Sequence, residues 1–472
     1  MRNVSSYIWG MIGKLGPQII YLITTIILSR FLTPSDFGKI GVLAIFTSVS
    51  QTLLEAGLGG SLIKEKEITD LDCSTIFVYN IIVSFFLYVI IFIGSPYIET
   101  YFNIPGLKSI CRCLCLVFVI NSWGQIAQTL LFKELQFKVL MWSSLISVTI
   151  GSIIAIVSSI WLKWGVYSLI AYQLSQSSVY VTYNWWRCNF KLSFRFSIYS
   201  FKRLFSFGFF TTINGVVDTI YENIITSIFG KYLGVSKAGY LTQAKRIETA
   251  SIASLSGTIN SVAFPILTKL KDNKSDFIIE ANSLLKNLSL IILPLMLSIA
   301  FFSDAIIQIL FGTNWIEAAP YLKILMWTGC VFVLEAANRN FLKSLGKVKI
   351  LFVTTLIKRM IALSLIFICI KINVGWLLYT YFLGSIIGYI SNSIACSKAL
   401  RINVLNYLWE SLRYVLPPLL FYVLCNLYRT LFGIELISNI LGWIILILCY
   451  YILFLPQMGI NLINNLIKKV RN

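Results

Sequence analysis

The sequence predicts an all-α membrane protein with about fourteen transmembrane helices, built as two parallel six-helix lobes followed by two further helices. Three observations predict this fold: an apolar composition, a nearly continuous series of apolar runs, and an internal repeat. Hydrophobic residues make up 57% of the 472 residues, and charged residues only 12%. Because soluble domains carry about 25% charged residues, this composition excludes an ordinary soluble enzyme.

The apolar runs have the length of membrane spans, since a helix needs roughly 20 apolar residues to cross a bilayer. The segments between the runs are too short to hold a second folded domain. In chain order, the expected spans are Tyr7–Leu32, Ile40–Leu62, Cys73–Gly94, Ile110–Leu131, Val139–Trp161, Val166–Trp186, Ser206–Phe229, Ala244–Leu267, Leu284–Phe302, Leu322–Phe341, Ile350–Ile370, Gly375–Ser397, Tyr414–Tyr428 and Ile437–Leu455.

The charge balance limits the chemistry and the partners of the chain. There are 39 Lys and Arg residues against 19 acids, for a net charge of +20, and there is no histidine. The missing histidines exclude histidine-based acid–base catalysis and histidine metal sites. We therefore expect no enzyme, no cofactor and no metal. The basic residues alternate with apolar runs, which predicts a lipid bilayer as partner and no nucleic acid.

The basic residues also predict how the chain is oriented in the membrane. If the N-terminus is cytoplasmic and the spans alternate, most Lys and Arg outside the spans lie on the cytoplasmic side, as the positive-inside rule requires. The basic clusters near residues 187–203, 339–349 and 468–471 are then cytoplasmic. We expect a multi-pass protein of the bacterial inner membrane with both termini in the cytoplasm.

An internal repeat defines the expected domains. The turn Arg30-Phe31-Leu32-Thr33-Pro34-Ser35-Asp36-Phe37-Gly38 follows the first span, and Lys231-Tyr232-Leu233-Gly234-Val235-Ser236-Lys237-Ala238-Gly239-Tyr240 follows the seventh. The basic residue, the aromatic residue, Leu, Ser and Gly align at an offset of 201 residues. Six spans per copy place both copies parallel in the membrane, a layout of transporters. The expected domains are residues 1–200, 201–400 and 401–472.

Several short motifs resemble a known family. They are the Leu32–Gly38 turn, Ser61-Leu62-Ile63-Lys64, Trp164-Gly165-Val166-Tyr167-Ser168-Leu169, Phe205-Ser206-Phe207-Gly208, Lys231-Tyr232-Leu233-Gly234 with Ala238-Gly239-Tyr240, Ala263-Phe264-Pro265, and Phe311-Gly312-Thr313-Asn314-Trp315. In this order they resemble the Wzx-type flippases of lipid-linked oligosaccharides, closest to the branch like the colanic acid exporter. The resemblance covers most of residues 1–350. It implies the two-lobed, MATE-like fold of the MOP superfamily, a central cavity and alternating access.

Basic residues inside the spans are the first candidates for a site, because a charge in the bilayer is costly and usually faces a cavity. Arg binds phosphate oxygens in a bidentate manner, and Lys acts as a point charge. A cationic cavity would suit a diphosphate head group. The candidates are Lys14, Lys245, Arg246, Lys358 and Arg359. The alternative for the last four is that their long side chains extend to the membrane surface.

Acidic residues inside the spans are candidates for coupling transport to an ion or a proton. Asn214, Asp218 and Glu222 are four residues apart, which places them on one helix face. They are either a coupling site or ion-pair partners of Lys14, Lys245 or Arg246. Glu335 is a further candidate, although it is also spaced to pair with Arg339 on its own helix.

The resemblance and the buried charges together predict a transporter. Its expected function is to flip a polyprenyl-diphosphate-linked oligosaccharide across the inner membrane, for lipopolysaccharide, exopolysaccharide or capsule biosynthesis. A polysaccharide polymerase and glycosyltransferases of the same pathway are expected partners. The alternative is a cation-coupled multidrug or small-molecule antiporter on the same fold. A membrane enzyme is disfavoured, because the external loops are short and lack histidine.

Overall fold

The computed structural model describes residues 2–57, 61–62, 65, 67–190, 194–258, 264–432 and 436–454. In these residues the chain forms helices and no strand, which confirms the all-α prediction. Each of the fourteen predicted apolar runs overlaps a helix. Within the described part of the chain, 8 helices are long and apolar enough to cross a membrane. The total of fourteen spans therefore stays a prediction.

The chain divides into two compact units. The first unit comprises Met1–Ala250 with Leu310–Ala318, and the second comprises Ser251–Ile309 with Ala319–Asn472. The domain boundaries at 200 and 400, which come from the repeat, stay a prediction.

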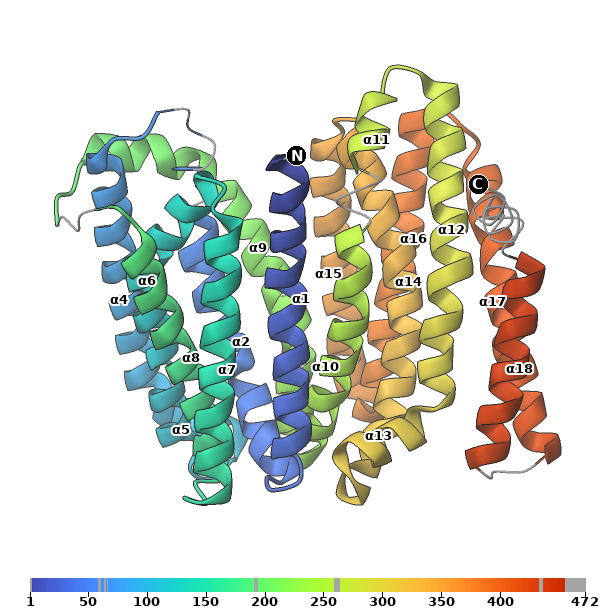
Figure 1. Cartoon of the computed structure of the whole chain (residues 1–472), viewed down its shortest axis with the longest axis horizontal. Coiled ribbons are helices and arrows are strands. Elements are labelled where there is room, and N and C mark those ends of the chain that lie inside the picture. The colour runs from blue at the N-terminus through green and yellow to red at the C-terminus, as the bar shows by residue number, and fades with distance from the viewer. Residues whose placement is uncertain are drawn as a thin grey trace, which may run out of the picture. The chain divides into compact units, whose positions relative to one another are not determined.

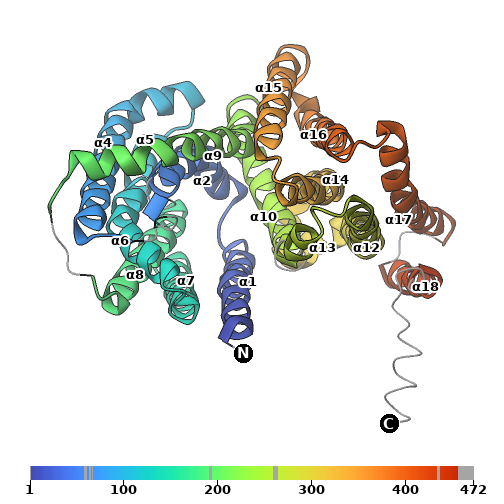
Figure 2. The ribbon, with the colours of Figure 1, turned by 90° about the horizontal axis from the view of Figure 1, so that it is seen from above.

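The first unit is a bundle of long helices, seen from the side in Figure 1 and end-on in Figure 2. Helix α7 packs against α1 and α8, α6 packs against α4 and α8, and α2 packs along α9. These elements are α1 (Arg2–Leu28), α2 (Pro34–Gly57), α4 (Asp70–Phe102), α5 (Leu107–Leu114), α6 (Leu116–Lys133), α7 (Phe137–Ile160), α8 (Val166–Arg187), α9 (Ile198–Tyr232), the larger part of α10 (Val235–Thr258), and the 3-10 helix η2 (Thr313–Ala318).

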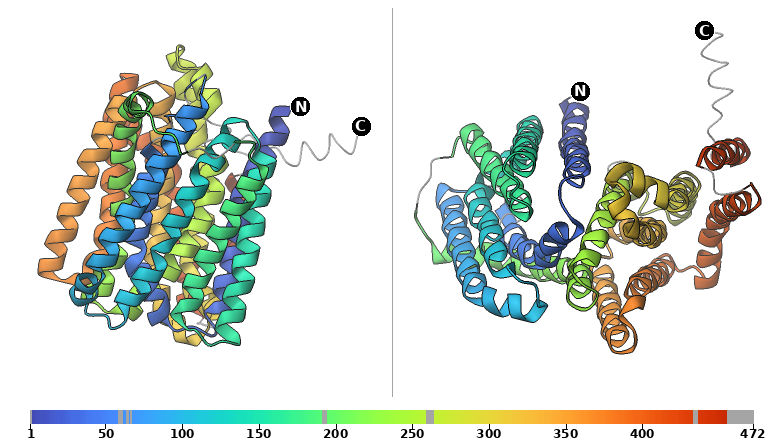
Figure 3. Two further views of the ribbon diagram at one scale, coloured as in Figure 1. Left: turned by 90° about the vertical axis from the view of Figure 1, so that its left-hand side faces the viewer. Right: turned by 90° about the horizontal axis from the view of Figure 1, so that it is seen from below.

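The second unit is a bundle as well, and Figure 3 shows its helices from two further sides. Helix α14 packs against α12 and α16, α15 packs against α16, and α17 packs against α12. These elements are α11 (Phe264–Lys269), α12 (Lys274–Phe301), most of α13 (Ser303–Phe311), α14 (Ala319–Ser344), α15 (Val348–Ile372), the 3-10 helix η3 (Val374–Trp376), α16 (Leu377–Leu400), α17 (Val404–Phe432) and α18 (Leu436–Phe454).

The internal repeat is visible in the order and the packing of the helices. Helices α2 and α10 begin at Pro34 and Val235 and end at Gly57 and Thr258, so both their starts and their ends are separated by the predicted offset. The series α4 to α8 and the series α12 to α16 each consist of a long helix, a short helix and three long helices. Equivalent pairs pack together in both series, for example α6 with α8 and α14 with α16.

The segment that joins the two repeats is attached to the first unit by polar contacts. Thr69 and Asp72 form a capping box at the start of α4. The carboxylate of Asp72 also lies 2.8 Å from the guanidinium of Arg203, near the start of α9. The Ser61 hydroxyl donates to the Leu204 carbonyl at 2.8 Å. The first turns of α9 (Figure 1, green, upper left) are therefore held against the start of α4.

Candidate functional site

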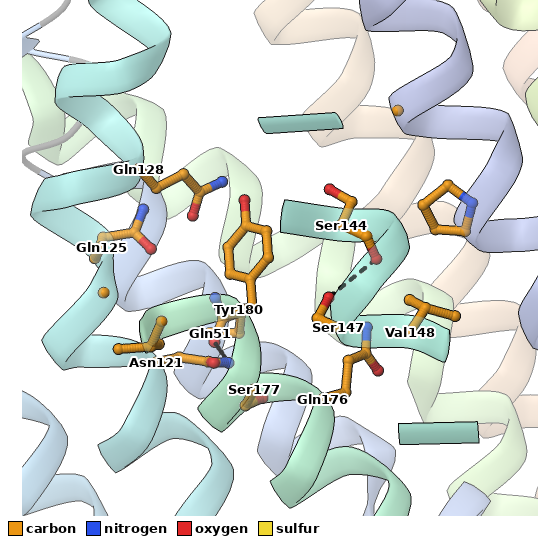
Figure 4. A pocket seen from close by; sticks show the side chains of 14 residues that line it. Gln51, Asn121, Gln125, Gln128, Ser144, Ser147, Val148, Gln176, Ser177 and Tyr180 are labelled. Atoms are coloured by element: carbon orange, nitrogen blue, oxygen red, sulfur yellow. Dashed lines mark hydrogen bonds between the residues drawn. The ribbon is translucent and has the colours of Figure 1, made fainter. Parts of the chain in front are cut away.

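The first unit contains a polar hollow of about 290 Å³ between α1, α2, α6, α7 and α8. Its wall consists mainly of amides and hydroxyls, and among the residues that the structure describes no charged side chain lines it. Figure 4 shows Gln125 and Gln128 on one side, Ser144 and Gln176 on another, and the Tyr180 ring between them. The lining residues are Gly13, Pro17, Gln51, Asn121, Gly124, Gln125, Gln128, Ser144, Ser147, Val148, Gln176, Ser177, Tyr180 and Val181.

Helical spacing explains why so many amides meet in this hollow. Asn121, Gln125 and Gln128 follow one face of α6, and Gln176 and Tyr180 follow one face of α8. Close packing of the two helices brings the faces together. A Cβ atom on Gly124 would lie 2.6 Å from the Val181 side chain, so only glycine allows this approach.

A second hollow of about 380 Å³ adjoins the first, and the two share Gln51 and Asn121. The Asn121 amide donates to the side-chain oxygen of Gln51 at 3.0 Å, which joins α6 to α2. The Thr52 and Thr219 hydroxyls are 2.8 Å apart and join α2 to α9. The lining residues are Thr47, Ser48, Gln51, Thr52, Val117, Phe118, Asn121, Gln173, Thr219, Glu222 and Asn223.

The acidic candidates on α9 differ in their placement. Glu222 is exposed and, of the described residues, is the one charged residue that lines the second hollow. Asp218 is half-buried one turn earlier on α9. The Asn214 side chain lies outside the described residues. The structure therefore brings Glu222 to a hollow.

The basic candidates of the first unit lie in three different environments. Lys14 is exposed on α1. The Lys245 ammonium donates to the backbone carbonyl of Glu222 at 2.7 Å, so it binds the backbone of α9. The Arg246 guanidinium lies 4.9 Å from the ring centre of Tyr21 and 5.1 Å from that of Phe37. Such distances are typical of cation–π contacts.

In the second unit, Glu335 and Lys358 are buried together. Lys358, only 4% exposed, donates to the Glu335 carboxylate. The Asn392 amide donates to the same carboxylate at 3.3 Å, and the Arg339 guanidinium nitrogen lies 4.0 Å from it. Glu335 thus contacts Arg339 as the alternative predicted, but Lys358 is its principal partner. Lys358 does not extend to the surface, because the buried carboxylate holds it. Arg359, the next residue, is half-buried.

None of the five predicted basic residues lines either of the two hollows. The neutral residues that do so are not among the predicted site residues, because the cost of burying a charge identifies only ionisable side chains. Their signal is an amide or hydroxyl repeated at helical spacing inside an apolar run, as in Asn121, Gln125 and Gln128.

At one end of the first unit, the two repeated turns lie against each other. A Cβ atom on Gly38 would collide with the carbonyl oxygen of Val235, and one on Gly239 with that of Pro34. These contacts are reciprocal, since Gly38 and Gly239 occupy the same repeat position, as do Pro34 and Val235. Helices α2 and α10 therefore cross with their backbones in contact, which small residues permit.

Residues 310–318, which we name the Trp315 cap, cover this crossing. The Trp315 indole, 1% exposed, donates to the Ser29 carbonyl at the end of α1 at 3.0 Å. Its ring meets those of Phe37 and Tyr240 edge-on, with centroids 5.3 and 6.0 Å away. The cap thus joins α1 to the first turns of α2 and α10.

A polar cavity among apolar helices of a repeated bundle is typical of a membrane transporter. The chain belongs to the family described as polysaccharide biosynthesis protein, whose model matches residues 27–320. This match confirms the resemblance found in the sequence.

Individual relatives agree with the family. The chain is 27% identical over 350 residues to the teichuronic acid biosynthesis protein TuaB of Bacillus subtilis, covering 73% of this chain and 71% of TuaB. It is 23% identical over 329 residues to the lipopolysaccharide biosynthesis protein WzxC of Escherichia coli, covering 70% and 67%.

Among solved structures, the fold is similar to the lipid II flippase MurJ in an inward closed conformation. The TM-score is 0.73 at 16% identity, and the match covers 94% of this chain and 99% of MurJ. This likeness confirms the predicted fold class.

Proposed function

We propose that this membrane protein carries a polyprenyl-diphosphate-linked oligosaccharide from the cytoplasmic to the outer leaflet of the bacterial inner membrane. The observation that carries the proposal is the pair of polar hollows enclosed by apolar helices, in a chain of a polysaccharide biosynthesis family. A hydrophilic head group needs such a polar path, because unpaired polar groups are costly in the hydrocarbon core. We propose that the lipid tail stays in the bilayer.

We propose alternating access, with the crossing of α2 and α10 as the outer closure. With both termini in the cytoplasm, α1 ends at the outer surface, and the crossing and the Trp315 cap then lie on the outer side. In the same topology, Gly13, Gln51 and Thr52 belong to the cytoplasmic halves of α1 and α2, and Pro17 lies near the middle of α1. We propose that the first hollow takes up the head group from the cytoplasmic side, and that the second hollow continues from it towards the outer halves of α6 and α9.

The charged candidates receive different roles in this proposal. Lys14 and Arg246 are proposed to meet the diphosphate during transport, and Lys245 to hold α10 against α9. Asp218 and Glu222 are the proposed coupling acids, with Asn214 on the same face of α9. Glu335 and Lys358 neutralise each other, so we propose that they stabilise the second unit. Arg359 is the basic residue next to this pair, and we assign it no separate role.

The proposed partners are the lipid-linked substrate, the bilayer, and the polymerase and glycosyltransferases that consume and supply the substrate. No catalytic role follows from the site, because its polar wall is built from amides and hydroxyls. Such groups bind and orient hydroxyl-rich ligands.

The test is a translocation assay with the purified full-length chain in liposomes. A labelled polyprenyl-diphosphate-linked oligosaccharide is placed in both leaflets, and its accessibility to an impermeant sugar-modifying enzyme is followed in time. We expect the whole pool to become accessible in the presence of the protein, and half of it in empty liposomes. An accessible fraction that stays at half with the protein present would contradict the proposal.

A further inference from the structure

The wall of the first hollow differs chemically from the predicted cationic cavity. Gln51, Asn121, Gln125, Gln128 and Gln176 are all neutral, and each amide offers both a donor and an acceptor. Tyr180 adds an aromatic ring and a hydroxyl in the same wall. A charged ligand group would lose its hydration here without gaining a counter-charge from this wall, which is unfavourable.

Three of the amides have hydrogen-bonding capacity to offer a ligand. Within the described part of the chain, no hydrogen bond engages the side-chain amides of Gln125, Gln128 and Gln176. Gln125 is 7% exposed, so its amide faces the hollow rather than the lipid. Gln128 and Gln176 are half-buried and line the same hollow, so a ligand in the hollow can reach all three amides.

The chemistry of this wall matches that of an uncharged sugar. Sugar hydroxyls donate and accept at once, as primary amides do. The apolar face of a sugar ring can pack on the Tyr180 ring. A hollow of about 290 Å³ is at the lower end of the ~300–1,000 Å³ range of small-ligand pockets, which suits a group of one or a few sugar rings.

We propose that Gln125, Gln128 and Gln176, together with Tyr180, form a subsite for uncharged sugar rings of the transported head group. This inference rests on the proposed function and makes it more specific. The subsite recognises hydroxyl-rich sugars, whereas the diphosphate is met by other side chains. The second hollow continues from Gln51 and Asn121 to Glu222 on α9, next to the backbone carbonyl that Lys245 binds. The head group would extend in that direction.

The test measures binding by the full-length protein in nanodiscs of three probes. The first is polyprenyl diphosphate linked to a neutral disaccharide, the second carries a uronic acid disaccharide, and the third is polyprenyl diphosphate without sugar. The variant is Gln125→Leu with Gln176→Leu, and the matched control is Gln308→Leu, at an exposed position of α13. If the double variant fails to fold, Gln128→Leu, at a half-buried position, takes its place.

We expect the wild type to bind the neutral probe at least about tenfold more tightly than the uronic acid probe. The double variant should bind the neutral probe about tenfold or more weakly than the wild type, because two hydrogen bonds are lost. Its affinity for polyprenyl diphosphate, and all affinities of the control, should change less than twofold. Equal binding of the neutral probe by wild type and variant would overturn the subsite, as would equal binding of the neutral and acidic probes.

The subsite and the proposed function fail in different ways. If the wild type translocates the lipid-linked sugar in liposomes and the double variant binds it equally well, the subsite is wrong and the function stands. If the wild type binds the neutral probe through these amides but translocates nothing, the function is wrong.

Discussion

Helices α6, α7 and α8 of the first unit and helices α14, α15 and α16 of the second are equivalent in the repeat, and each set gathers polar side chains. In the first set, neutral amides surround a hollow. In the second, Glu335, Lys358 and Asn392, one from each helix, bond to one another in the core. The Tyr407 hydroxyl donates to Asn338 at 2.6 Å and Asn338 donates to Ser393 at 2.9 Å, which forms a second polar cluster in the same set.

We propose that one scaffold serves two purposes. A polar cluster whose groups satisfy each other stabilises and orders a bundle, whereas one whose groups face a cavity remains available to a ligand. We therefore assign substrate recognition to the first set and structural cohesion to the second.

Removing one partner of the buried ion pair should have the largest effect. Glu335→Ala leaves the Lys358 ammonium buried without its counter-charge, which typically costs about 3–5 kcal/mol of unfolding free energy. Replacing both partners by Glu335→Gln with Lys358→Met removes both charges and should stay within about 1 kcal/mol of the wild type. Thermal unfolding of the purified protein in detergent measures both. A double variant as unstable as the single one would show that the pair does not act as a unit.

Substitutions at the crossing of α2 and α10 test whether the equivalent glycines of the two repeats make equivalent contacts. Gly38→Ala and Gly239→Ala each place a Cβ atom against a backbone carbonyl, so each should destabilise the protein by about 1–3 kcal/mol. Because the collisions are reciprocal, the two variants should lose similar stability. Gly94→Ala on α4 is the control, since a Cβ atom there meets nothing within 4 Å. If Gly94→Ala lowers the unfolding free energy as much as Gly38→Ala and Gly239→Ala do, the backbone contact is refuted.

The amides of the first set should contribute little to stability. Gln125→Leu keeps the size of the side chain and removes no hydrogen bond to a described residue, so the unfolding free energy should change by no more than about 0.5 kcal/mol. The same unfolding measurement applies. A loss comparable to that of Glu335→Ala would mean that the hollow is part of the structural core.

The fold was largely predictable from the sequence, whereas the site was predictable only in part. The length of an apolar run is a local signal that predicts a helix, and the similarity of the Gly38 and Gly239 turns at a fixed offset predicts the repeat. Helical spacing predicts neighbours on the same helix, such as Glu335 and Arg339. The pairing of Glu335 with Lys358 joins two different helices, so helical spacing does not predict it. The amides at Gln125 and Gln176 are neutral, so the cost of burying a charge in the membrane does not identify them.

The assignment of substrate recognition to the first set and structural cohesion to the second is tested most directly by the translocation rate of two double variants in liposomes. The first is Gln125→Leu with Gln176→Leu, and the second is Glu335→Gln with Lys358→Met, both reconstituted in equal amounts as folded protein. With a neutral lipid-linked disaccharide, we expect the first variant to translocate about tenfold more slowly than the wild type, because two hydrogen bonds to the substrate are lost. The rate of the second variant should stay within a factor of about two of the wild-type rate. A normal rate for the first variant with a strongly reduced rate for the second would contradict the assignment of substrate recognition to the first unit.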